Sequence, residues 1–184
     1  MRNWRRDSSQ RVFECRVFTV RCDSNCSPST NTTHEFFVIE PANWVNVIAI
    51  TDIGEVVLIR QYRHGMSTVT LEIPGGMIDP EESAEIAARR ELREETGYEA
   101  ESWRLLGICD PNPALQNNRC YTFLAEQARP VAEQKLDHTE EIEVLLLPLK
   151  DIANLITDGR ITHALVITAF YYLELFRQDI AASL

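Results

Sequence analysis

The sequence lacks a long apolar run and any excess of basic residues. Its apolar stretches are far shorter than the roughly 20 residues that a membrane-spanning helix needs. Lys and Arg number 18 against 28 Asp and Glu, which gives a formal net charge of −10. This balance disfavours nucleic acid or an anionic membrane surface as the main partner. We therefore expect neither, and an anionic substrate would need a local positive charge.

A secretion signal and a zinc-binding pattern are also missing. The N-terminal MRNWRRDSSQR has no apolar segment behind its charges. The five cysteines are odd in number, and the pair Cys22 and Cys26 has no second ligand pair at zinc-site spacing. These features predict a cytoplasmic protein with reduced thiols, in which Cys22 and Cys26 are loop thiols rather than metal ligands.

The N-terminal part reads as a β segment. Residues 11–21 and 34–40 alternate apolar and polar side chains, as strands with one buried face do, and a polar turn segment separates them. Such a hairpin cannot bury its apolar face alone. It must pack on the main body or on another subunit, and we predict the latter, with a β segment at residues 1–42 ahead of a main domain at residues 43–184.

The main domain alternates strands with helices. Strands are predicted for WVNVIAIT, VVLIRQYR, STVTLEIP, WRLLGIC, RCYTFLAEQ and EIEVLLLPL. Helices are predicted near residues 150–159, stopped by Gly159, and after Thr162, which is a suitable cap. Because strands precede and follow a central helix, the sequence predicts an α+β fold in which helices flank a mixed β-sheet.

The central helix has recognisable ends. Asp79 is a suitable N-cap, Pro80 fits the first helical position, and Glu82 stands where a capping box places its glutamate. Gly97 supplies a C-terminal stop. These signals predict a helix from Pro80 to Thr96.

Three glutamates crowd one turn of this helix. Glu91 and Glu95 are four residues apart, and Glu94 flanks them, so their carboxylates can converge on one point. Hard oxygen donors of this kind suit Mg²⁺ or Mn²⁺. The alternative is a solvated acidic face. That alternative is weakened by the position at a helix C-terminus, where negative charge is disfavoured, and by the arginines between the glutamates.

Residues 76–98 resemble the signature of the Nudix hydrolases, G-x5-E-x7-R-E-U-x-E-E-x-G-U with U aliphatic. The matching residues are Gly76, Glu82, Arg90, Glu91, Leu92, Glu94, Glu95 and Gly97. Only Tyr98 departs, and we expect it to affect packing rather than a metal site. Seven fixed letters match by chance about once in a million chains of this length.

This resemblance covers residues from about 44 to 176 and implies an α/β/α sandwich. It also implies hydrolysis of a nucleoside diphosphate linked to a further group, with Mg²⁺ as cofactor. By the same likeness, Glu91, Glu95 and the Gly75 carbonyl are metal ligands. Glu94 would orient or bridge, and Arg90 would brace the loop and helix together with Glu82.

The region before the signature resembles the ADP-ribose and nucleoside diphosphate sugar pyrophosphatases. In that subgroup an arginine at the matching strand end points toward the substrate phosphates, which is Arg63 here; the alternative is a surface arginine. Pro113 stands 15 residues after Tyr98, as in ADP-ribose pyrophosphatases. Met77 is a further candidate substrate contact, and Trp44 is a candidate for stacking on a base or for the core.

The loop LDHTEEIEV, residues 136–144, resembles an acidic loop that brings a further glutamate to the metals and supplies the general base. Glu140 matches the metal-binding position. The base could be His138, Asp137, Glu140 or Glu141, or the metal alone could activate the water. His138 suits this role if nearby cations keep its imidazole neutral.

The N-terminal segment resembles a small β-domain that the subgroup exchanges across a two-fold axis, so we expect a homodimer. The resemblance predicts hydrolysis of ADP-ribose or a related nucleoside diphosphate sugar to a nucleoside monophosphate and a sugar phosphate. Alternatives are a hydrolase of nucleoside triphosphates, dinucleoside polyphosphates or coenzymes, and a regulator that senses nucleotide sugars without catalysis.

Overall fold

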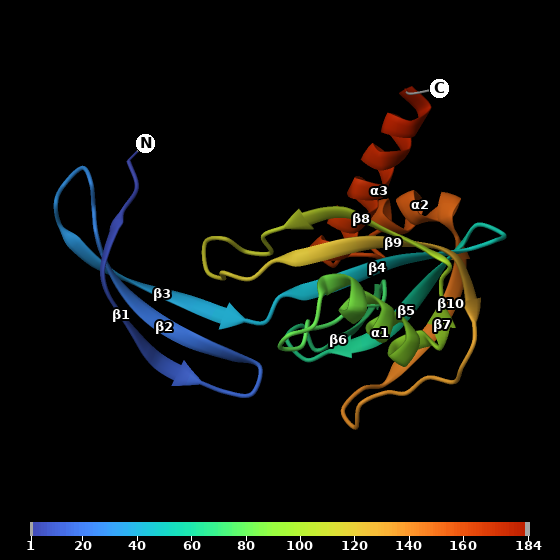
Figure 1. Cartoon of the computed structure of the whole chain (residues 1–184), viewed down its shortest axis with the longest axis horizontal. Helices are drawn as coiled ribbons and strands as arrows, with labels where there is room; N and C mark the ends of the chain where they lie inside the picture. Colours follow the sequence, from blue (N-terminus) through green and yellow to red (C-terminus); the bar gives the residue numbers. More distant parts are fainter. Residues whose placement is uncertain (1, 183–184) are drawn as a thin grey trace. The chain divides into compact units, whose positions relative to one another are not determined.

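The computed structural model describes residues 2–182 of the chain (Figure 1). The described residues form two compact units. One unit holds the residues up to 43 together with 110–119, and the other holds 44–109 and the residues from 120 onward. Each unit is built on its own β-sheet.

The smaller unit is a three-stranded antiparallel sheet in the order β1-β2-β3. Its strands are β1 Arg5–Glu14, β2 Phe18–Cys26 and β3 Thr33–Pro41. The prediction of one strand over residues 11–21 was wrong, because the chain reverses after Cys15, whose N–H donates to the Phe18 carbonyl at 3.0 Å. Cys22 and Cys26 lie in β2 rather than in a loop, and both are free thiols.

The larger unit contains a seven-stranded mixed sheet. Its strands are β4 Trp44–Thr51, β5 Glu55–Arg63, β6 Thr68–Glu72, β7 Tyr98–Glu99, β8 Ser102–Cys109, β9 Cys120–Pro130 and β10 Ile142–Pro148. β4 and β9 run parallel, and the other pairs are antiparallel. All strands predicted for this unit are present, whereas the two-residue β7 was not predicted.

Helices cover both faces of this sheet (Figure 1). They are α1 Ala84–Thr96, α2 Ile152–Thr157, which follows a 3-10 turn η1 at Leu149–Asp151, and α3 Ala164–Ala182. Val45, Val47 and Ala49 of β4 pack with α1, whereas Ile48 between them packs with α2 and α3. The period of two along a strand thus creates one core on each face, which confirms the predicted mixed sheet flanked by helices. Across residues 2–182, no helix has the length and apolarity needed to cross a membrane.

Two helices begin later than the sequence predicts. Ser83 caps α1, because its Oγ accepts the Ile86 N–H at 3.2 Å. Glu81 has a φ of +68°, which breaks the helical path predicted from Pro80. Likewise, α3 begins at Ala164 rather than directly after Thr162. The C-terminal stop of α1 at Gly97 is confirmed, with a φ of +76°.

Candidate active site

Residues 73–83 connect β6 to α1 and form one wall of the site. The loop lies against β4, where the Val45 N–H donates to the Gly76 carbonyl at 2.9 Å. A Cβ on Gly75 would stand 2.1 Å from the Val45 oxygen, and one on Gly76 would stand 2.4 Å from Oε1 of Glu91. At Gly75 only glycine allows this approach to the backbone, whereas a side chain at position 76 would displace the Glu91 carboxylate. No described residue donates a backbone hydrogen bond to the Gly75 carbonyl, which leaves it available to a ligand.

Arg90 supplies a positive charge among the clustered glutamates of α1. Its guanidinium forms two hydrogen bonds with Glu82, at 2.9 and 3.0 Å, and one with the Met77 carbonyl at 3.0 Å. Its Nη1 also donates to Glu91 at 2.8 Å and to Glu94 at 3.2 Å. The hydrogen bonds with Glu82, the negative charge of Glu91 and the hydrogen bonds with Glu91 and Glu94 raise the pKa of Arg90. The loop and the helix are thereby joined by one side chain.

Glu95 has no such partner. Glu95 is only 3% exposed, and its carboxylate accepts the Gly75 N–H at 2.9 Å. Burial raises the pKa of Glu95 to about 8, and the negative charges of Glu91 and Glu140 add to the rise. Burial likewise raises the pKa of Glu91. The site therefore holds one buried carboxylate without an ion-pair partner among residues 2–182, next to the half-buried Glu91 that Arg90 contacts.

A second wall comes from the segment between β9 and β10. The Lys135 N–H donates to the Glu94 carbonyl at 2.8 Å, and the Gln134 amide donates to the Glu95 carbonyl at 2.6 Å and to the Ile142 carbonyl at 3.2 Å. The last carbonyls of a helix have no partner within the helix itself. These bonds therefore satisfy the end of α1 and hold the acidic loop beside it.

The acidic loop brings only part of its predicted residues to the site. Asp137 and Glu140 line the cavity, and Glu140 Oε2 accepts the Asp137 N–H at 3.0 Å. His138 and Glu141 are not among the lining residues. Two of the four candidate bases are thus brought to the carboxylate cluster.

The walls enclose a cavity of about 450 Å³, which we call the carboxylate pocket. Its lining residues are Gln61, Arg63, Gly75, Gly76, Met77, Asp79, Arg90, Glu91, Glu94, Glu95, Lys135, Asp137 and Glu140. Eight of the eleven residues proposed from the sequence as site residues line it: only His138, Trp44 and Pro113 do not. Lys135 was not recognised from the sequence, because a single loop lysine carries no motif.

Arg63 is held at the rim of the carboxylate pocket by a buried glutamate. Its Nε and Nη2 donate to the two oxygens of Glu72, each at 2.8 Å. Glu72 also receives hydrogen bonds from Thr70 at 2.6 Å and pairs with His163 Nδ1 at 2.7 Å. Burial acts to raise the pKa of Glu72, but the hydrogen bonds from Arg63, His163 and Thr70 outweigh it and lower the pKa. His163 could not be linked to this site from the sequence, because 91 residues separate it from Glu72.

Comparisons with known proteins agree with this geometry. A family model described as a NUDIX domain matches residues 40–170. The chain belongs to the Nudix family. The chain is 28% identical over 169 residues to the ADP-ribose pyrophosphatase of Bacillus subtilis (strain 168), with 91% of each chain covered. It is 29% identical over 168 residues to the methanol dehydrogenase activator of Bacillus methanolicus, with 91% of this chain and 90% of the relative covered.

A solved structure supports the fold assignment. The crystal structure of an ADP compounds hydrolase superposes with a TM-score of 0.86 at 24% identity, covering 97% of this chain and 96% of that chain. The Nudix fold and the pyrophosphohydrolase class that residues 76–98 predicted are confirmed.

Of the other three candidate substrate contacts in this Nudix protein, one lines the carboxylate pocket and two do not. Met77 lines the carboxylate pocket, and its backbone forms an antiparallel bridge with Trp44. The Trp44 side chain does not itself line the cavity. Pro113 belongs to the smaller unit, so its contact with substrate stays a prediction.

The chemistry of the Nudix signature fits a hard divalent cation. Glu91, Glu95 and Glu140 offer carboxylate oxygens, and the Gly75 carbonyl is a suitable fourth donor. Within the described residues, no three acidic, His or Cys side chains already surround one point. Arg90 draws Glu91 to itself, and the Gly75 N–H holds Glu95. Burial raises the pKa values of Glu91 and Glu95, and a cation bound beside them would favour their charged forms.

The buried charge of Glu95 should destabilise the metal-free fold. Because its folded pKa of about 8 exceeds the ordinary 4.5, the folded state binds more protons than the unfolded state between these values, and stability falls as pH rises through this window. Glu95→Gln keeps an acceptor for the Gly75 N–H and cannot ionise. In chelator at pH 8 we expect it to raise the free energy of unfolding in urea by about 1 to 3 kcal/mol, with a smaller gain at pH 5.

Glu94→Gln is the matched control, because Glu94 lies on the same turn and is paired with Arg90. We expect no gain from it at either pH. Equal or lower stability of Glu95→Gln at both pH values would show that Glu95 is not a charge that burial penalises.

Proposed function

We propose that this Nudix protein hydrolyses the diphosphate linkage of ADP-ribose or a related nucleoside diphosphate sugar. Water adds to one phosphorus, the bridging P–O bond breaks, and the products are a nucleoside monophosphate and a sugar phosphate. Mg²⁺ is the proposed cofactor, and Mn²⁺ is expected to replace it. The observation that carries the proposal is the buried carboxylate of Glu95 beside the half-buried Glu91 at the glycine loop, where burial raises the pKa of both groups.

The choice of substrate class rests on the relatives. The Bacillus subtilis relative is an ADP-ribose pyrophosphatase, and the likeness to it extends over 91% of both chains rather than over the signature alone. Arg63 lines the carboxylate pocket as well, and because Glu72 takes its Nε and Nη2, it is Nη1 that we propose for contact with a phosphate oxygen.

The proposed roles follow from position in the carboxylate pocket. Glu91, Glu95, Glu140 and the Gly75 carbonyl would hold the metal, which supplies positive charge to the phosphate oxygens and lowers the pKa of a water. Glu94 would orient that water. Arg90 is proposed to fix the glycine loop against α1, because it contacts Glu82 and the Met77 carbonyl together.

The proton of the attacking water needs an acceptor. Asp137 and Glu140 line the carboxylate pocket, whereas His138 and Glu141 do not. We therefore propose Asp137 or Glu140 as the general base. His138, which the sequence also offered for this role, is the less favoured candidate. The Asp137 N–H, which donates to Glu140, would keep the loop closed around this carboxylate.

Other functions remain distinguishable from this one. A regulator without catalysis would not need the glutamates of the signature, and all of them are present here. Hydrolysis of nucleoside triphosphates, dinucleoside polyphosphates or coenzymes would use the same metal site with a different specificity. Only a direct comparison of substrates separates these activities.

The test is a substrate panel of ADP-ribose, GDP-mannose, UDP-glucose, NADH and diadenosine polyphosphates, assayed for phosphate products with Mg²⁺, with Mn²⁺ and in chelator. We expect metal-dependent hydrolysis with a preference for ADP-ribose or another nucleoside diphosphate sugar. Glu95→Gln should lower turnover by roughly 1,000-fold or more, because it removes a ligand charge and almost no volume. Glu85→Gln, on the exposed side of the same helix, is the control and should retain turnover. Turnover in chelator, or full turnover in Glu95→Gln, would contradict the proposal.

The proposal includes a homodimer and a cytoplasmic location. The smaller unit exposes several aromatic side chains: Trp4 at 47%, Phe13 at 52%, Phe36 at 41% and Phe37 at 55%. Phe36 and Phe37 are neighbours in β3, so they lie on opposite faces of the sheet, and a second copy that covers one face would bury part of these side chains. Light scattering at micromolar concentration should give twice the monomer mass, and a monomer would count against the dimer.

The free thiols support a reducing compartment, as expected for a cytoplasmic protein.

A further inference from the structure

Three cationic side chains line the carboxylate pocket against six carboxylates. The two arginines are already engaged: Arg63 with Glu72, and Arg90 with Glu82 and two glutamates of α1. Lys135 differs from both. Lys135 is exposed, and its ammonium has no ion pair or hydrogen bond with any residue in the range 2–182, although it lines the same cavity as the six carboxylates. It is therefore the cation of this pocket that is free to take a ligand.

The position of Lys135 is fixed by its backbone rather than by its side chain. Its N–H donates to the Glu94 carbonyl, and the preceding Gln134 is bonded to the Glu95 and Ile142 carbonyls. The Cα of Lys135 is thus anchored to the turn of α1 that carries the proposed metal ligands. Only the four-carbon side chain has to move to reach a ligand.

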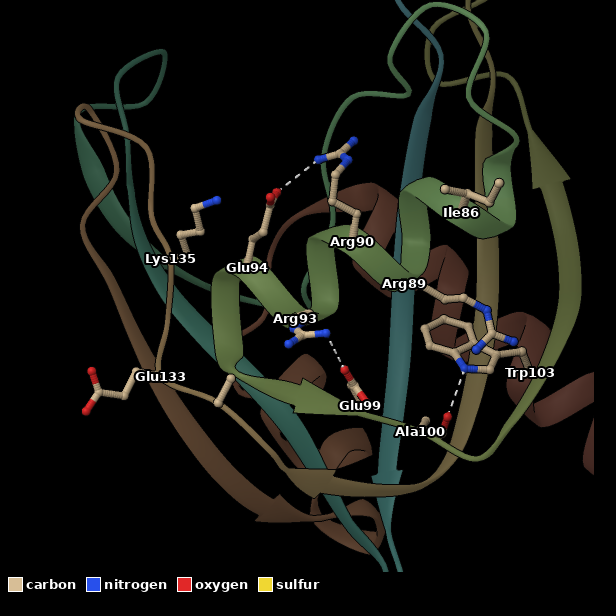
Figure 2. Close-up of a pocket in the computed structure, with 11 residues that line it drawn as sticks. Ile86, Arg89, Arg90, Arg93, Glu94, Glu99, Ala100, Trp103, Glu133 and Lys135 are labelled. Atoms are coloured by element: carbon tan, nitrogen blue, oxygen red, sulfur yellow. Dashed lines mark hydrogen bonds and ion pairs between the residues drawn. The ribbon is translucent and has the colours of Figure 1, made fainter.

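Lys135 also borders a second cavity, of about 760 Å³, over the outer face of α1 (Figure 2). This cavity shares Arg90, Glu94 and Lys135 with the carboxylate pocket. Its other cations are engaged: Arg93 pairs with Glu99 at 2.7 Å, and Arg89 pairs with Glu85 and lies 4.6 Å from the ring centre of Trp103. Of the cations that line these two cavities, Lys135 alone has no carboxylate partner among the described residues.

Lysine is a rare residue in this chain. Of the 18 basic residues, only Lys135 and Lys150 are lysines. An arginine at position 135 would offer a planar fork that matches a carboxylate in a two-bonded pair, and carboxylates abound in this pocket. A lysine instead offers a compact point charge on a flexible stem. A point charge of this kind can bind a phosphate oxygen that arrives with the substrate.

We propose that the Lys135 ammonium binds a phosphate oxygen of the diphosphate substrate in the carboxylate pocket. The inference rests on the proposed function, since it needs a substrate that carries a diphosphate. Lys135 then supplies the local positive charge that an acidic protein needs for an anionic substrate. Lys135 lies in the segment between β9 and β10, and Arg63 lies at the end of β5, so the two residues can be substituted independently.

The kinetic test compares Lys135→Met with Lys135→Arg, using the preferred diphosphate substrate of the wild type. A charge-assisted hydrogen bond contributes about 1.5 to 3 kcal/mol, so Lys135→Met should lower kcat/KM by about 10- to 100-fold. We expect most of this loss in KM, because the contact is made in the bound substrate. Lys135→Arg keeps the charge and should recover part of the loss. Lys150→Met, beyond the far end of β10, is the matched control and should equal the wild type.

A second readout does not depend on turnover. An amine-reactive acylating reagent, with mass spectrometry of the peptides, reports the accessibility of Lys135 and Lys150 in the same sample. A methylene analogue of ADP-ribose with Mg²⁺, at a concentration that inhibits the wild type, should slow acylation of Lys135 several-fold and leave Lys150 unchanged.

The outcomes separate this inference from the proposed function. Loss of kcat/KM in Lys135→Met together with protection of Lys135 supports the contact. Wild-type kinetics in Lys135→Met, or unchanged acylation of Lys135 with inhibiting analogue, overturns it while leaving the hydrolase intact. A wild type that hydrolyses no diphosphate of the panel overturns the proposed function itself, and with it the substrate contact.

Discussion

The buried carboxylate of Glu95 is the constraint on which the site depends. It is held at the end of α1, against the Gly75 N–H and within the influence of Glu91 and Glu140, and its pKa rises to about 8 as a result. A helix selected for stability alone would not keep such a group. Its retention makes sense if a cation that is not part of the chain joins the cluster, since that cation would turn an unfavourable burial into a binding site.

The arginines of the site do not neutralise the buried negative charge of Glu95. Arg90 joins Glu82 on the loop to Glu91 and Glu94 on the helix, so its charge is used to hold the two walls together. Arg63 is oriented by Glu72, which Thr70 and His163 support in turn. The two arginines thus hold the loop, the strand end and the helix in place. The carboxylate of Glu95 is left to bind a metal in the proposed function.

Much of this arrangement could be predicted from the sequence because it is local. The spacing of Glu91, Glu94 and Glu95 and the glycines before the helix define the signature, and the strands of the larger unit follow from their apolar runs. The start of α1 was misplaced because Asp79 and Pro80 are good start signals for a helix, yet tertiary structure uses them in a turn before Ser83. The long contact between His163 and Glu72 and the anchoring of Lys135 carry no local signal, so only the fold reveals them.

The most direct measurement of the central claim is isothermal titration of the protein with Mg²⁺ and with Mn²⁺, in the presence of a non-cleavable ADP-ribose analogue. The account predicts binding of at least one dication per chain for the wild type, with release of protons near pH 7, because Glu95 must lose its proton when the metal binds. It predicts that binding is strongly weakened in Glu95→Gln. A wild type that takes up neither metal under these conditions would contradict the account.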